Sequence, residues 1–211
     1  MNRILPIALI AVTAGAFLHA RGNRVPQTVT DAQKDSSSQK DSTSPRPMIL
    51  QDGDGDHLIH TSGPLSGLPF SIKVDSEYGN AQDFFVFTSI LAPGQTIPFH
   101  KHDNAEELLM PEEGGLSVIV GDKRAVAGPR SIVFIPRDTW ISGTNTGGKD
   151  IHMTAIFSRP GFEKYMRAIG TKPGQPIIAV PADQLTGLRA MGHAMYWDTS
   201  KGPYPPGVAH P

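Results

Sequence analysis

The sequence predicts an all-β fold, either a sandwich or a barrel, with helices only near the C-terminal end. Between residues 51 and 157, short apolar runs rich in β-branched and aromatic residues alternate with turns of Gly, Pro, Asp and Asn. Short strands at this close spacing are typical of sandwiches and barrels. Apolar residues adopt a helical spacing only after residue 160. No internal repeat is visible, so we expect a single barrel over residues 51–165.

Eight segments are predicted to be strands because each is a short run of apolar and β-branched residues bounded by turn residues. They are residues 58–60, 70–74, 84–91, 97–102, 107–110, 116–120, 131–135 and 151–157. The run Phe84-Phe85-Val86-Phe87 fits a strand with both faces covered.

Two short helices are predicted in the C-terminal part, and residues 166–211 are expected to form a helical extension. The first helix is indicated by four apolar residues at i, i+3, i+4 and i+7, namely Phe162, Tyr165, Met166 and Ile169. Gly170 would supply its C-cap. Leu185, Leu188 and Met191 indicate the second helix. These helices would cover an end of the barrel or form the contacts of a homodimer.

The N-terminal segment has the layout of a secretory signal. Arg3 precedes an apolar run over residues 4–18, which is too short to span a bilayer comfortably. The small residues Ala14-Gly15-Ala16 offer one cleavage site, and Leu18-His19-Ala20 offers a poorer second. We expect residues 1–20 to be a signal peptide that sends the protein to the periplasm or out of the cell, with no membrane association after cleavage. An uncleaved amphipathic anchor is the alternative.

Composition and charge indicate a disordered segment and exclude several kinds of partner and site. Residues 21–48 are rich in Ser, Asp, Lys, Gln and Thr, so we expect a disordered linker. The 19 basic and 20 acidic residues nearly balance, which argues against nucleic acid as a partner. The chain contains no cysteine, so disulfides, thiolate zinc sites and cysteine nucleophiles are excluded.

A metal site is predicted around residues 94–107. Side chains alternate along a strand, so His100 and His102 would point the same way, about 6.6 Å apart. Residues 103–105 are predicted to form a hairpin turn that returns a carboxylate, Glu106 or Glu107, beside the imidazoles. Two neutral nitrogen donors and one carboxylate suit a divalent ion such as iron, manganese or zinc, with positions left for water or substrate.

The same stretch resembles the first sequence motif of the cupin superfamily. In that motif a glycine is followed by five residues, His-x-His, three or four residues, a glutamate, six residues and a glycine. Gly94, His100, His102, Glu107 and Gly114 match it. The resemblance therefore implies that His100, His102 and Glu107 are the metal ligands. Strand alternation would then turn residues 107, 109 and 111 inward, and the proline at 111 would end the strand or cause a bulge.

Residues 128–145 resemble the second cupin motif, with two departures. Pro136 and Asn145 fall where the family has them. Arg130 stands where a glycine is usual, and Ile141 stands where the family has its fourth ligand, a histidine. An apolar side chain cannot coordinate, so the site would have three protein ligands unless His152 from the following strand supplies another.

The chain resembles bacterial single-domain cupins, which implies a jelly-roll β-barrel, or double-stranded β-helix. The first functional hypothesis is a quercetin-dioxygenase-like, metal-dependent enzyme that acts on a small aromatic or enolic molecule. Glu106 would be its proton acceptor if it turns toward the cavity. The second is a non-catalytic module that binds a sugar or small acid, which Ile141 favours. A third is a purely structural or interaction protein.

Overall fold

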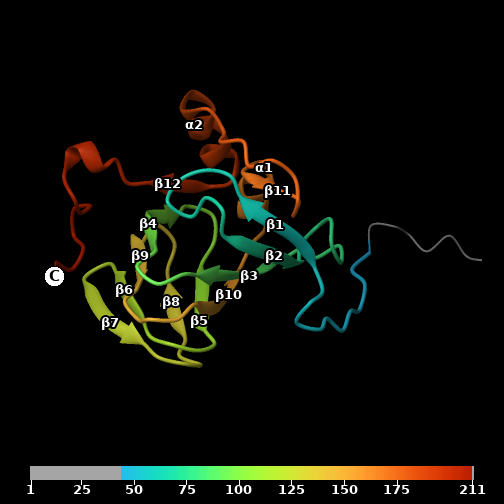
Figure 1. Cartoon of the computed structure of the whole chain (residues 1–211), viewed down its shortest axis with the longest axis horizontal. Helices are drawn as coiled ribbons and strands as arrows, with labels where there is room; N and C mark the ends of the chain where they lie inside the picture. Colours follow the sequence, from blue (N-terminus) through green and yellow to red (C-terminus); the bar gives the residue numbers. More distant parts are fainter. Residues whose placement is uncertain (1–43, 211) are drawn as a thin grey trace, which may run out of the picture. The chain divides into compact units, whose positions relative to one another are not determined.

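The computed structural model describes residues 44–210, which form two antiparallel β-sheets with short helices at one end (Figure 1). The predicted signal peptide and residues 21–43 of the predicted linker lie outside the described residues. Residues 45–50 form neither helix nor strand. Within residues 44–210, no helix has the length and apolar character needed to cross a membrane.

The larger sheet has seven strands in the order β11-β1-β2-β3-β10-β5-β8. Its strands are β1 (Asp56–His60), β2 (Pro69–Val74), β3 (Phe85–Leu91), β5 (Glu107–Pro111), β8 (Val133–Ile135), β10 (Ile151–Phe157) and β11 (Gly170–Thr171). The smaller sheet has the order β12-β4-β9-β6-β7. Its strands are β4 (Thr96–His102), β6 (Leu116–Val120), β7 (Lys123–Ala127), β9 (Ile141–Asn145) and β12 (Ala194–Tyr196). Every pairing in both sheets is antiparallel, which confirms the predicted all-β fold.

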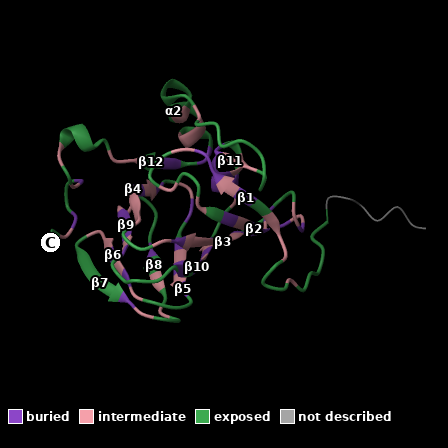
Figure 2. Ribbon diagram, in the orientation of Figure 1, coloured by how far each residue is buried: buried purple, intermediate pink, exposed green. Residues whose placement is uncertain are grey.

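The core is formed by the inward faces of these strands. Along β10, residues 151, 153, 155 and 157 are buried while His152 is exposed, as the pleat of a strand requires. Phe85, Phe87 and Phe157 stack on one another with ring centroids 5.4–6.1 Å apart. Figure 2 shows buried segments on the strands of both sheets, whereas β7 and much of helix α2 (Ala182–Met191) are exposed.

The strand predictions missed four strands, because β7, β9, the two-residue β11 and β12 lie outside the predicted segments. Strand β7 is an edge strand exposed along four of its five residues, so it has no apolar periodicity to detect. Strand β9 is built from small and polar residues and extends because β4 and β6 flank it. Strand β12 has three residues and is defined by its pairing with β4. Long-range hydrogen bonding, not local propensity, forms these strands.

The predicted hairpin at residues 103–105 is wrong. Strands β4 and β5 belong to different sheets, so the connection between them crosses from one sheet to the other. Contacts to the segment after β10 hold this crossing. The Glu106 N–H donates to Ser158 Oγ at 2.9 Å, the Ser158 N–H donates to the Glu106 carbonyl at 2.9 Å, and Asn104 Nδ2 donates to the Pro160 carbonyl at 3.1 Å. The chain thus places Glu107 opposite the β4 histidines.

Both predicted helices are present. Helix α1 (Phe162–Ala168) buries Phe162, Tyr165 and Met166. Its C-cap is Ile169 and not the predicted Gly170, which begins β11. Helix α2 follows Pro181 and has no fully buried residue. A single 3-10 turn, η1 (Thr199–Lys201), follows β12.

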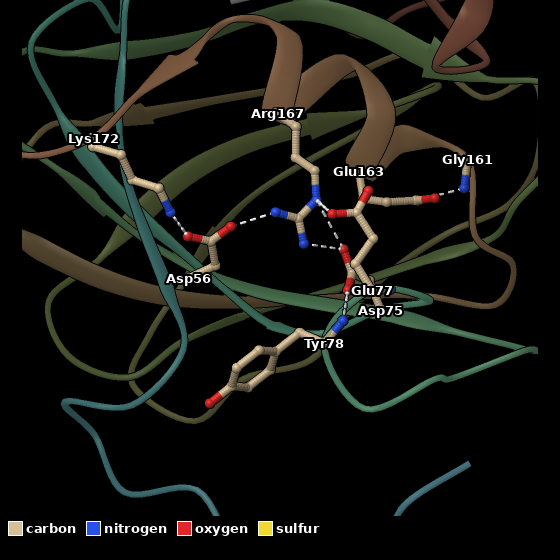
Figure 3. Close-up of polar contacts among 8 residues, drawn as sticks. All are labelled: Asp56, Asp75, Glu77, Tyr78, Gly161, Glu163, Arg167 and Lys172. Carbon is tan, nitrogen blue, oxygen red and sulfur yellow. Dashed lines mark hydrogen bonds and ion pairs between the residues drawn. The ribbon is translucent and has the colours of Figure 1, made fainter. Parts of the chain in front are cut away.

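A polar network fixes α1 against the first strands (Figure 3). Arg167 of α1 donates from Nη2 to Asp75 Oδ2 at 2.6 Å and also binds Asp56 of β1, which accepts from Lys172. Asp75 is fully buried, and its other oxygen accepts the backbone N–H groups of Glu77 and Tyr78. Burial alone would raise the pKa of Asp56, but its hydrogen bonds to Lys172 and Arg167 outweigh that effect and lower it.

Candidate metal centre

The structure brings His100, His102 and Glu107 together in the barrel interior. His100 and His102 are two residues apart on β4 and therefore share its inward face, as predicted. Glu107 opens β5 on the facing sheet. One potential ligand atom from each residue lies within 4.8 Å of the other two. The three residues keep only 6%, 3% and 6% of their surface exposed, respectively.

His100 is oriented by the backbone two residues before it. Its Nδ1 lies 2.8 Å from the Pro98 carbonyl and must donate there, because a carbonyl only accepts. The Nε2 lone pair is therefore left for another partner. The β4–β9 pairing shifts register between Ile97 and His100. A proline within a strand has no N–H for the ladder, which accounts for an irregularity at this point.

Three buried polar atoms of this cluster are not satisfied by well-formed hydrogen bonds from the described residues. Within residues 44–210, His102 Nδ1, His102 Nε2 and Glu107 Oε2 are buried and form no hydrogen bond of good geometry. A buried polar atom without a partner costs about 1–3 kcal/mol, so three at one point require an explanation. Two imidazole nitrogens and a carboxylate oxygen that face each other are what a divalent transition metal takes as ligands. The residues present therefore fit a metal ion.

Burial sets the protonation of all three side chains in the metal-free protein. It lowers the pKa of His102 to about 3 and lowers the pKa of His100, so both imidazoles are neutral and able to coordinate. It raises the pKa of Glu107 to about 8. A cation bound between the three side chains would stabilise the ionised carboxylate and would therefore lower the pKa of Glu107 again.

Aromatic side chains surround the two histidines. The His102 ring has Phe157 at 5.0 Å and Phe162 at 4.5 Å, both edge to face. The Tyr196 ring of β12 stacks on His100 at 5.4 Å. These rings limit the access of water and hold the imidazoles in place. Tyr196 also lies in register with His100 across the β12–β4 pair.

The position of the usual fourth ligand is apolar. Ile141 is buried and lies opposite His100 in the β4–β9 pair, so its side chain is on the same face of the sheet. His152 does not replace it, because its side chain is exposed on the outer face of β10, 3.6 Å from Glu113. In the part of the chain that the structure describes, the cluster has three protein donors and no more.

Glu106 is not brought to the site. Its side chain is exposed and does not line the cavity, while strand alternation turns Glu107 inward. The predicted role of Glu106 as a proton acceptor requires that it turn toward the cavity, and in this structure it does not. Residues 107, 109 and 111 are buried and residues 108 and 110 less so, as the alternation predicts. Pro111 ends the strand, also as predicted.

A cavity of about 240 Å³ adjoins the cluster and includes His100 and Glu107 in its lining. Much of the remaining lining is apolar, with Phe87, Leu109, Phe157 and Phe162 among its side chains. Tyr165, Arg189, Tyr196 and Trp197 add polar groups from the C-terminal part. The sequence patterns did not reveal Arg189, Tyr196 and Trp197, because they reach the cavity only through the packing of α2 and β12.

In a comparison with protein families, residues 87–157 match the cupin domain. The match covers about a third of the chain, including the three clustered residues and Ile141. The two antiparallel sheets, with the inward-facing His-x-His pair between them, form a cupin fold. No curated protein matches the sequence.

Several solved structures are similar to the chain. The polyketide cyclase RemF from Streptomyces resistomycificus is 18% identical, with a TM-score of 0.46 over 53% of this chain and 79% of its own. A sugar phosphate isomerase of the cupin superfamily from Silicibacter pomeroyi is 19% identical, with a TM-score of 0.46 over 53% and 76%. An oxalate oxidase in complex with the substrate analogue glycolate is 21% identical, with a TM-score of 0.44 over 53% and 59%. These similarities say nothing about the activity of this chain.

Metal binding is expected to release a proton from Glu107. With its pKa at about 8, this carboxyl is protonated at pH 6.5 and must ionise to coordinate, whereas burial lowers the pKa of both imidazoles and so favours their neutral, coordinating form. We expect about one proton released per Mn²⁺ bound at pH 6.5 and about a quarter of one at pH 8.5. Calorimetric titrations in buffers of different ionisation enthalpy measure this number. Proton release near zero at pH 6.5 would contradict the assignment.

Proposed function

We propose that this protein is a metal-binding cupin in which His100, His102 and Glu107 hold one divalent ion at the base of the cavity. The observation that carries the proposal is the set of buried donor atoms without partners, at a point where both imidazoles are neutral. With three protein ligands, an octahedral ion keeps positions for water and for a small molecule entering from the cavity. Iron, manganese and zinc all suit this donor set.

We further propose a dioxygenase-type reaction on a small aromatic or enolic molecule. When bound, iron or manganese would supply the redox chemistry that such a reaction requires. The chain's own residues would bind and orient the substrate: Phe87, Phe157 and Phe162 offer flat apolar contacts for a conjugated ring, and they keep bulk water from the donors. Desolvation, together with the hydrogen bond to Tyr165, raises the pKa of Tyr196 well above its ordinary value, so its phenol stays protonated beside the cavity.

A non-catalytic binding module is the second candidate, and Ile141 is the observation that favours it. An isoleucine beside His100 removes a ligand and makes the metal surroundings more apolar. A site with one donor fewer should hold metal more weakly. In this case the cavity would retain a sugar or small acid without converting it.

Elemental analysis followed by a turnover assay tests these proposals. We expect close to one metal ion per chain in protein purified without chelators from metal-supplemented medium. The loaded protein is then incubated in air with flavonoids, keto acids and sugars, and products and oxygen uptake are measured. Oxygen uptake with a new product supports the enzyme; binding seen by thermal shift without conversion supports the module. Metal content near zero overturns the metal proposal.

The location of the protein is proposed from residues 1–20 alone. Their short positively charged start and apolar run favour export to the periplasm or beyond. An exported protein also suits the absence of cysteine, since no thiol would be exposed to oxidation.

A further inference from the structure

Arg189 lines the cavity and forms no ion pair with the described residues, although it also borders a second pocket whose lining includes Asp103 and Asp138. It lies in the last turn of α2, where its side chain is half-buried. It forms no hydrogen bond and no ion pair with any of residues 44–210, and its Nε is fully buried without a partner. A guanidinium offers five donors and is always charged, so leaving it unpaired in a partly dry site is costly.

The position of Arg189 is fixed by an aromatic ring that also contacts the metal cluster. Its guanidinium carbon lies 4.5 Å from the centroid of the Tyr196 ring, and the same ring stacks on His100 at 5.4 Å. These two contacts place the guanidinium within about 10 Å of the imidazole. A cation–π contact orients the guanidinium but satisfies none of its N–H donors.

The charges around the cavity are unbalanced in favour of an anion. Glu107 is the sole carboxylate among the side chains that line it, while Arg189 contributes a permanent positive charge. A divalent ion on the cluster would add two more positive charges, of which Glu107 offsets one. In an apolar cavity such an excess attracts a negatively charged ligand strongly.

We infer that the ligand of this cavity is a small carboxylic acid with an apolar, preferably aromatic body, whose carboxylate is bound by Arg189. The fork of the guanidinium matches a carboxylate in a bidentate geometry. The body of the ligand would lie among Phe87, Phe157 and Phe162, with its far end toward the metal cluster. A cavity of about 240 Å³ limits the ligand to a molecule of roughly one ring. This inference rests on the proposed function and narrows its substrate class to acids.

Phenylacetate and its neutral, nearly isosteric amide phenylacetamide are suitable probes. Calorimetric titration of the full, Mn²⁺-loaded protein compares the wild type, Arg189→Gln and the control Arg137→Gln, an exposed arginine that does not line the cavity. We expect the wild type to bind phenylacetate at least tenfold more tightly than phenylacetamide, and Arg189→Gln to lose that preference. Arg137→Gln should behave as wild type, although it changes the net charge equally.

Metal content measured on the same samples tests the metal proposal separately from the inference that Arg189 binds a carboxylate. If the wild type holds Mn²⁺ but binds acid and amide equally, or if Arg189→Gln retains the preference for the acid, the Arg189 inference is wrong and the metal proposal stands. If the wild type holds no Mn²⁺, the metal proposal fails. A preference for the acid that Arg189→Gln removes in the metal-free protein would then still support the role of Arg189. Circular dichroism confirms that the variants are folded.

Discussion

Replacing His102 with glutamine is expected to reduce metal affinity by more than about 100-fold, since loss of groups that merely support a ligand already costs 10–100-fold. His102 is the least exposed of the three donors, and neither of its nitrogens makes a hydrogen bond of good geometry with the described residues. A purely structural role would therefore not account for an imidazole at this position. Glutamine fills most of the same space between Phe157 and Phe162. Elemental analysis and competition with a chromophoric chelator measure the effect.

His152→Gln is the matched control. This histidine is on β10 with its side chain exposed, and its contact is a 3.6 Å approach to Glu113. It should leave metal content unchanged within error. Stoichiometric metal in the His102 variant, with an affinity like that of the wild type, would show that the ion binds elsewhere. Equal losses in both variants would indicate that histidines bind metal non-specifically.

The predictable part of the site is the part encoded by local alternation. The pleat of a strand alone puts His100 and His102 on one face, and the same rule chooses between Glu106 and Glu107 once one of them faces inward. Similarly, β6 and β10 alternate buried and less buried residues. Strand β3, expected to be covered on both faces, is fully buried only at Phe85 and Leu91, and Phe84 before it is exposed. The face that a side chain occupies can be predicted from periodicity because it depends mainly on the position of the residue in its own strand.

Features that depend on distant parts of the chain were not predictable from local patterns. The residues between His102 and Glu107 suit a hairpin, and only the pairing of β5 with β10 and β8 shows that they cross between sheets. Strand β12 is too short to detect, and its pairing with β4 places Tyr196 on His100. Arg189 belongs to a helix with a mostly exposed surface, so its sequence context indicates a solvated residue.

Replacing Arg167 with leucine is expected to lower the free energy of unfolding by about 3–5 kcal/mol, because it leaves the fully buried Asp75 without its cation. Arg167 binds Asp75 and Asp56 from α1 (Figure 3), so its loss also frees the helix that carries Phe162 and Tyr165 to the cavity. Urea unfolding followed by circular dichroism measures the change. Because α1 packs against His102 through Phe162, weaker metal binding should accompany it.

Lys172→Leu tests whether the loss of stability comes from leaving a buried charge unpaired or from losing any ion pair. Lys172 binds the same Asp56, but its side chain is 62% exposed, so its removal should cost less than about 1 kcal/mol. Combining Arg167→Leu with Asp75→Asn should recover part of the lost stability, since the amide oxygen still accepts from Glu77 and Tyr78 while no charge stays buried. If Arg167→Leu and Lys172→Leu lower the free energy of unfolding equally, or if the double variant recovers no stability, then the buried charge of Asp75 is not the reason that Arg167 stabilises the fold.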